Sequence, residues 1–282
     1  MRWSILVRLG TTIAALCLMG AAMSAEFRIE TTVVIGDSAE ALSRNTTLFH
    51  SAVVYDYLTL GATNSTSETT VFDPGRQRIF LLDPRHRIQS EFAREDIEKF
   101  VEWLRTHAAG DANPYLRFLA KPTFEESFDR QTGELRFESP WMTYHLETHL
   151  APSHAVARQY GEFSHWYARL NTMTNPGALP PFARARVNEA LEAHRRIPRR
   201  VDLVVTPQGS SKDERYELHS DHRVGWELTA EDLRMIDRTR RELGEFERLA
   251  PEAYARRRAP TTAAMERPPE QVTGTGRRAA RR

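Results

Sequence analysis

Three side chains that could bind a metal ion or move protons recur at two-residue intervals, as His145, Glu147 and His149. Side chains two positions apart lie on the same face of a β-strand, so this spacing would gather two imidazoles and a carboxylate, with His154 close behind. The spacing matches none of the zinc signatures, in which ligand intervals are narrowly fixed. We therefore interpret these histidines as structural, and we predict no metal site and no cofactor.

A second group of reactive residues is the consecutive run His219, Ser220, Asp221 and His222. We also interpret these histidines as structural, because their spacing matches no zinc signature either. A ligand role for either histidine group requires the fold to bring its members together.

Sequence motifs of common enzymes are absent. The chain has no G-x-S-x-G nucleophile motif, no glycine-rich phosphate loop and no dinucleotide fingerprint. We therefore predict no catalytic residues and favour a non-enzymatic protein. An unrecognised hydrolase is an alternative, and it would need His145, His149 or His222 to meet a carboxylate in a cleft.

The elements that would position such residues begin with a strand meander. Ser51–Thr59, Glu68–Asp73 and Gln77–Asp83 are rich in β-forming residues. The intervening Asp73-Pro74-Gly75-Arg76 predicts a type II turn, with proline setting the first central φ angle and glycine accepting a positive one. An amphipathic helix should follow, because apolar residues from Ile97 to Ala108 recur with helical spacing and Gly110 is a typical stop.

Continuous apolar positions from Ile79 to Leu82 predict a sheet that is covered on both faces. Both faces could pack against protein, or one could pack on helices while the other lines a cavity. For the second alternative, we predict that Tyr55, Tyr57, Phe80 and Leu82 contact an apolar ligand.

The remainder of the chain repeats the pattern of strands followed by helices. An aromatic stripe at helical spacing, Val156, Tyr160, Phe163, Tyr167 and Leu170, predicts a core helix. Thr229 and Asp232 suit the start of a last helix by a capping box. The remaining elements are predicted as strands at 27–35, 124–128, 134–138, 141–149, 201–206 and 215–219, and as helices at 114–120 and 182–194. We predict an α+β domain over residues 26–255, in which a curved antiparallel β-sheet packs against amphipathic helices, with two sheet-plus-helix halves as an option.

The first 25 residues have the features of a secretory signal peptide. Arg2 supplies the positive start, residues 9–19 are mostly apolar and residues 20–25 are small. The apolar core is shorter than the ~20 residues of a membrane span, so we expect no transmembrane anchor in the mature chain. Export would make the protein periplasmic or secreted. The single cysteine, Cys17, lies in this segment, which leaves no thiol or disulfide in the mature chain.

Charge is distributed unevenly along the chain. The tail at 256–282 has eight arginines and two glutamates, a net charge of +6, whereas residues 26–255 carry −7. The tail is rich in arginine and proline and poor in large apolar residues, so we predict that it is disordered. It could contact anionic lipid or an envelope polymer. We expect no nucleic-acid partner, because the tail lacks interleaved aromatic residues.

The segments Val53–Leu58, Glu68–Asp73 and Arg78–Pro84 resemble a group of exported proteins from planctomycete-type bacteria. More distantly, they resemble the periplasmic lipoprotein-carrier (LolA-like) fold. That resemblance implies a half-barrel sheet wrapped over helices, with an apolar cavity for acyl chains and no catalytic residues. The extra region 114–200 and the basic tail depart from the carrier pattern.

Our first hypothesis is therefore an exported, non-enzymatic envelope protein that binds an apolar or lipid-like ligand. The second is an envelope scaffold that uses its acidic body and basic tail, and the third is the unrecognised hydrolase.

Overall fold

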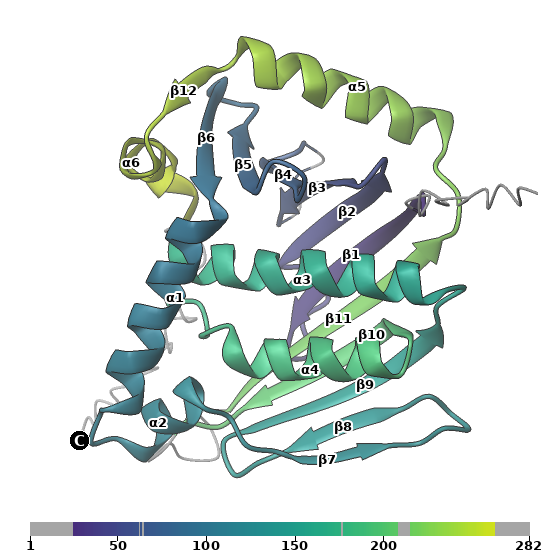
Figure 1. Ribbon diagram of the computed structural model, residues 1–282, viewed down its shortest axis with the longest axis vertical. Helices are drawn as coiled ribbons and strands as arrows, with labels where there is room; N and C mark the ends of the chain where they lie inside the picture. The colour runs from purple at the N-terminus through teal and green to yellow at the C-terminus, as the bar shows by residue number, and fades with distance from the viewer. Residues whose placement is uncertain (1–24, 62, 64, 176, 208–214, 263–282) are drawn as a thin grey trace, which may run out of the picture.

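The computed structural model describes residues 25–61, 63, 65–175, 177–207 and 215–262, with side chains to residue 257. Nearly all of the predicted signal peptide and most of the basic tail lie outside these residues. Within them the α+β prediction is confirmed, since the chain forms one open, curved sheet with helices packed on it (Figure 1). No helix in this part of the chain has the length and hydropathy of a membrane-spanning segment.

The sheet contains twelve strands in the order β12-β6-β5-β4-β3-β2-β1-β11-β10-β9-β8-β7. All neighbours are antiparallel except β12 and β6. The strands are β1 (Phe27–Ile35), β2 (Ser43–His50), β3 (Val53–Leu60), β4 (Glu68–Asp73), β5 (Arg78–Asp83), β6 (Ile88–Ala93), β7 (Glu125–Phe128), β8 (Leu135–Glu138), β9 (Met142–Leu150), β10 (Arg196–Val205), β11 (Tyr216–Gly225) and β12 (Glu247–Leu249). The helices are α1 (Arg94–Ala109), α2 (Pro114–Ala120), α3 (His154–Thr174), α4 (Phe182–Ala193), α5 (Ala230–Glu245) and α6 (Pro251–Thr262).

Two runs of strands join through the pairing of β1 with β11, so the early meander β1–β6 and the later strands share one sheet. Strands β10 and β11 extend well beyond the predicted segments 201–206 and 215–219. The missed portions are rich in Arg and His, which weakened the apolar signal. Pairing with β9 and β1 holds these portions in the sheet, where every second side chain can face solvent.

Turn chemistry differs from the prediction at 73–76, where a type II turn with Gly75 in the left-handed region was expected. The left-handed residue is instead Gln77, at φ 56°. The Asp73 Oδ1 atom accepts a hydrogen bond from the Arg76 amide at 3.0 Å, which fixes the turn through the aspartate. The next connection repeats this design, with Asp83 Oδ1 accepting from the His86 amide at 3.0 Å and Arg87 at φ 54°.

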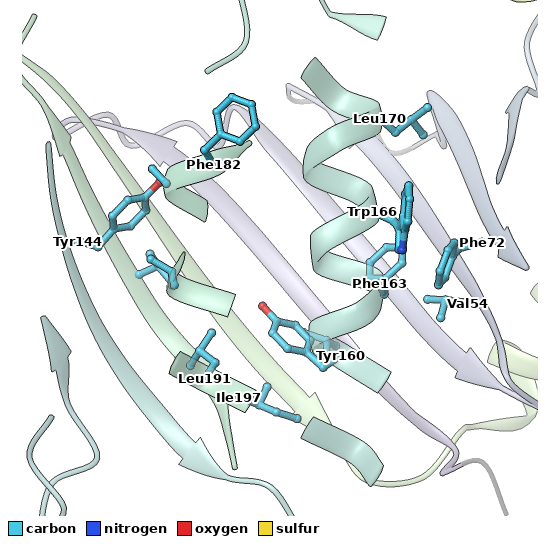
Figure 2. Packing of buried hydrophobic residues seen from close by; sticks show 14 of the residues in the cluster. Val54, Phe72, Tyr144, Tyr160, Phe163, Trp166, Leu170, Phe182, Leu191 and Ile197 are labelled. Carbon is cyan, nitrogen blue, oxygen red and sulfur yellow. The ribbon is translucent and has the colours of Figure 1, made fainter. Parts of the chain in front are cut away.

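The inner face of the sheet packs against α3 and α4, which lie side by side across it (Figure 1). The predicted aromatic stripe of α3 supplies this contact, because Tyr160, Phe163 and Leu170 are all buried. Figure 2 shows Phe163 and Trp166 directed from α3 toward Val54 and Phe72 on the strands. Burial of such side chains contributes about 1.5–3 kcal/mol each, so α3 is a principal support of the inner face.

The outer face of strands β2–β5 is covered by α5. Leu48, Tyr55, Val71 and Leu82 pack there with Ile236 and other side chains. The predicted capping box that begins α5 is confirmed, since Asp232 and Thr229 accept each other's backbone N–H groups. This arrangement confirms the expectation that the sheet is covered on both faces in this region.

We expect Asp232→Ala to destabilise the protein by about 3 kcal/mol, because the substitution removes a cap and takes the buried partner from Arg28, which keeps only its ion pair with the more exposed Glu30. The Asp232 carboxylate is 1% exposed, and Arg28 Nη1 donates to both of its oxygens at 3.0 Å. Urea unfolding measures the change. Asp237→Ala, on the exposed side of the same helix, is the matched control and should alter stability by less than about 0.5 kcal/mol. Equal effects of the two substitutions would contradict this account of how α5 is anchored.

Candidate functional site

A cavity of about 930 Å³ lies between the inner face of the sheet and helices α3 and α4. This volume falls within the range of about 300–1,000 Å³ that is typical of pockets for small molecules. Its walls are largely apolar and come from both runs of strands and both helices, including Ile29, Phe49, Leu58, Leu81, Val201, Leu203, Phe163, Tyr167 and Leu179. The cavity can therefore hold an apolar molecule of the size of a lipid chain.

Strand alternation determines which residues reach this cavity. In β3 the side chains of Asp56 and Leu58 line it, whereas Tyr55 and Tyr57 point to the opposite face. In β5 the inner residue is Leu81, and its neighbours Phe80 and Leu82 face outward.

The four residues predicted to contact an apolar ligand thus lie together, but on the outer face. Tyr55, Tyr57, Phe80 and Leu82 are 3%, 7%, 9% and 0% exposed and pack with α5 residues. The Tyr57 hydroxyl is also 3.0 Å from Thr239 Oγ1 on α5. None of the four lines the inner cavity, whose walls are formed by other residues of the same strands.

A buried carboxyl group forms part of the cavity wall. Asp56 accepts hydrogen bonds from Thr47 Oγ1 at 2.6 Å and from Asn45 Nδ2 at 2.7 Å. Burial raises the pKa of Asp56 to about 6, although both hydrogen bonds lower it. The only signal in the sequence was an acidic residue inside the apolar run of β3, and sequence reasoning missed its role.

His222 lies on the inner face, where its ring nitrogens meet two hydroxyl groups. Nδ1 is 2.9 Å from Thr31 Oγ1, and Nε2 is 3.0 Å from Ser220 Oγ. Burial lowers the pKa of His222 to about 3, with a further contribution from the charge of Arg184. An imidazole that resists protonation is a poor general base, and the polar partners of His222 among the described residues are these two hydroxyl groups.

Two other candidate histidines, His145 and His219, meet the same carboxylate. Asp202 of β10 sits between His145 and His219 on the neighbouring strands, 3.7 Å from Nδ1 of the first and 2.6 Å from Nδ1 of the second. Arg200 also donates to Asp202 at 2.9 Å. This is a partly exposed charge network on the sheet surface, and it adjoins the cavity at His219, which is one of the lining residues.

The remaining members of the two predicted groups do not complete a metal site. Glu147 pairs with Arg199, while His149 and His154 are exposed. Among the residues that the structure describes, no cluster of three His, Cys, Asp or Glu side chains could hold a metal ion.

A positively charged group reaches the cavity from α4. Arg184 lines it beside Tyr160 and Tyr144, and nothing in the sequence distinguishes this arginine from the others around it. Its position depends on how α4 packs beside α3, which sequence periodicity does not reveal.

Comparison with known proteins gave no relatives from which to assign a role, since no family model and no curated protein matches the chain.

We expect Leu82→Ala to lower the free energy of unfolding by about 2–5 kcal/mol, because the side chain is fully buried beneath α5. Binding of an apolar fluorescent probe to the folded protein should stay unchanged. Leu203→Ala, which alters the cavity wall from the inner face, is the comparison and should change probe affinity. If Leu82→Ala changed probe affinity as strongly as Leu203→Ala, the division between the two faces would be wrong.

We also expect Asp56 to make stability depend on pH. The folded protein holds the Asp56 proton more tightly than the unfolded chain, where the pKa is about 3.9. The stabilisation from this group is full below about pH 4 and is lost as the pH rises through about 6, a change of about 3 kcal/mol.

Asp56→Asn should remove that dependence. The free energy of unfolding of this variant, relative to that of the unsubstituted protein, should therefore rise by about 2.4 kcal/mol between pH 4 and pH 7.5. Urea unfolding at several pH values measures the difference. Asp37→Asn, at an exposed position, is the control and should give a constant difference. Parallel pH curves for Asp56→Asn and the unsubstituted protein would show that Asp56 titrates normally.

Proposed function

We propose that this chain is a non-enzymatic binding or carrier protein that holds an apolar, lipid-like ligand between its curved sheet and α3 and α4. The observation that carries the proposal is the large, mainly apolar cavity on the inner face. Each methylene group that a ligand buries there would contribute about 0.8 kcal/mol, so a long hydrocarbon chain would bind well.

The architecture supports the same proposal. An open, curved antiparallel sheet with helices across its inner face is the arrangement implied by the resemblance to the lipoprotein-carrier fold. We propose that the sheet and helices act as a half-barrel of this kind, with α3 and α4 forming one wall of the ligand site. Because carriers of this type bind rather than transform their ligands, the proposal requires no catalytic group.

We also propose, independently of the ligand, that the protein is exported to the periplasm or the exterior. It rests on the sequence of residues 1–25, which lie almost wholly outside the described residues. The envelope-scaffold hypothesis depends mainly on the tail at 256–282, most of which also lies outside them, and stays a prediction.

Filling the cavity tests the ligand proposal. Ala168 lines the cavity from α3, and Ala168→Trp should place an indole in the ligand's space. Native mass spectrometry of protein purified gently from its host should show an added mass that organic solvent extracts. We expect this mass in the unsubstituted protein and a loss of at least about tenfold in its occupancy in Ala168→Trp.

Arg158→Trp is the matched control, because it puts the same side chain on an exposed position of α3. It should retain the added mass. Equal occupancy in Ala168→Trp and Arg158→Trp would exclude the cavity as the binding site. An unsubstituted protein that carries no extractable mass and takes up no acyl probe would overturn the proposed function.

A further inference from the structure

Arg184 reaches the cavity without a carboxylate partner. It lies in the first turn of α4, where its Nε donates to Asn188 Oδ1 and its Nη2 donates to the Tyr160 hydroxyl, both at 3.2 Å. Both of these partners are neutral. No described residue forms an ion pair with Arg184, whereas other arginines of the described chain, such as Arg186, meet carboxylates. The guanidinium therefore brings an uncompensated positive charge to a largely apolar wall.

The same corner of the cavity has several hydrogen-bond donors. A guanidinium has five N–H groups, and the two contacts of Arg184 use only two of them. The Tyr160 hydroxyl accepts from Arg184, so its own proton is available to another acceptor. Figure 2 shows this hydroxyl directed away from the α3 backbone.

Tyr144 adds a third donor from β9. Its ring is 4% exposed and it lines the cavity, yet its hydroxyl makes no hydrogen bond with another residue in the described part of the chain. Burial raises the pKa of Tyr144 to about 12, while the charge of Arg184 acts in the opposite direction, so the hydroxyl keeps its proton at neutral pH. The hydroxyl is therefore free to donate to a ligand in the cavity that accepts hydrogen bonds.

Neighbouring groups leave the positive charge in place. His222, whose pKa is lowered to about 3, carries no competing positive charge at neutral pH. The N-cap residue of α4, Pro181, makes no side-chain hydrogen bond to the free N–H groups of the helix. The acidic residues of the cavity wall, Asp56 and Glu68, come from β3 and β4. Strands β2 and β1 separate β3 from β11, which puts Asp56 about 14 Å from the strand of His222.

We infer that the ligand is an anionic amphiphile, whose carboxylate or phosphate binds Arg184 with the Tyr160 and Tyr144 hydroxyls while its hydrocarbon chain fills the apolar part of the cavity. The inference rests on the proposed function and specifies its ligand class. A planar guanidinium with adjacent hydroxyl donors suits either oxyanion.

Three probes test it on the full chain after removal of bound lipid: cis-parinaric acid, its methyl ester, and a lysophosphatidate that displaces the fluorescent acid. Fluorescence titration gives each affinity. We expect Arg184→Met to bind the acid about 10-fold to 100-fold more weakly and the neutral ester within about twofold of the unsubstituted protein. Whichever of the carboxylate and the phosphate binds more tightly identifies the head group, and either result supports the inference.

Arg186→Met is the matched control, because this arginine lies on the same helix, is ion-paired with Glu126 and Glu189 and is not part of the cavity wall. It should bind both parinaric probes as the unsubstituted protein does. Tyr144→Phe removes only one hydroxyl and should weaken binding of the acid about 3-fold to 10-fold without affecting the ester. If thermal unfolding shows that Arg184→Met does not fold, Tyr144→Phe alone tests whether the head group of the ligand is anionic.

The possible failures are distinguishable. If the acid and the ester bind with equal affinity, and Arg184→Met and Tyr144→Phe change neither, the anionic head group is wrong while the apolar cavity stands. If neither probe binds to the unsubstituted protein, the proposed function fails as well.

Discussion

The pairing of β1 with β11 is the interaction on which the rest of the structure depends. It joins two antiparallel runs of strands, β1–β6 and β7–β11, into a single curved surface. Residues from both runs then meet on the inner face, as Thr31 of β1 and His222 of β11 do through their side chains. Without the pairing of β1 with β11 the two runs of strands would form two separate sheets, and the sheet wall of the cavity, to which both runs contribute, would be interrupted.

The two faces of the sheet are packed differently, because the outer face is closed by a helix and the inner face retains a cavity. On the outer side, α5 closes over aromatic and aliphatic residues of β2–β5, and the buried contact between Arg28 and Asp232 holds its start against β1. On the inner side, α3 and α4 pack against the strands but leave space between them, and that space contains a few polar groups. These groups are hydrogen-bonded within the wall at Asp56 and His222, but retain unused donors at Arg184.

Much of the fold could be predicted from spacing and turn residues. The helix that ends at Gly110, the aromatic core helix α3 and the capping box at Thr229 all follow from local patterns, and the structure confirms them. The turn at 73–76 could not be predicted correctly, because the side chain of Asp73 and a left-handed Gln77 replace the expected glycine conformation.

The assignment of residues to the cavity was less predictable. Residues Ile79 to Leu82 are all apolar and all buried, so both faces of β5 look alike in sequence. Alternation therefore cannot tell which face of the strand lines the cavity. The answer depends on α5, which comes more than 140 residues later in the chain and covers Phe80 and Leu82. Arg184 depends in the same way on helix packing, so only the tertiary structure reveals that a cation enters an apolar wall.

An open sheet has two edges, and in this protein both belong to short strands. At one edge β7 has four residues, among them Glu125 and Glu126, both exposed. At the other edge β12 has three residues, and its parallel pairing covers the backbone of β6. Short and charged edges offer little template for a strand from another molecule. The protein can therefore keep a wide, open sheet, which its cavity requires, while limiting the self-association into fibrils or domain-swapped aggregates that long free edges promote.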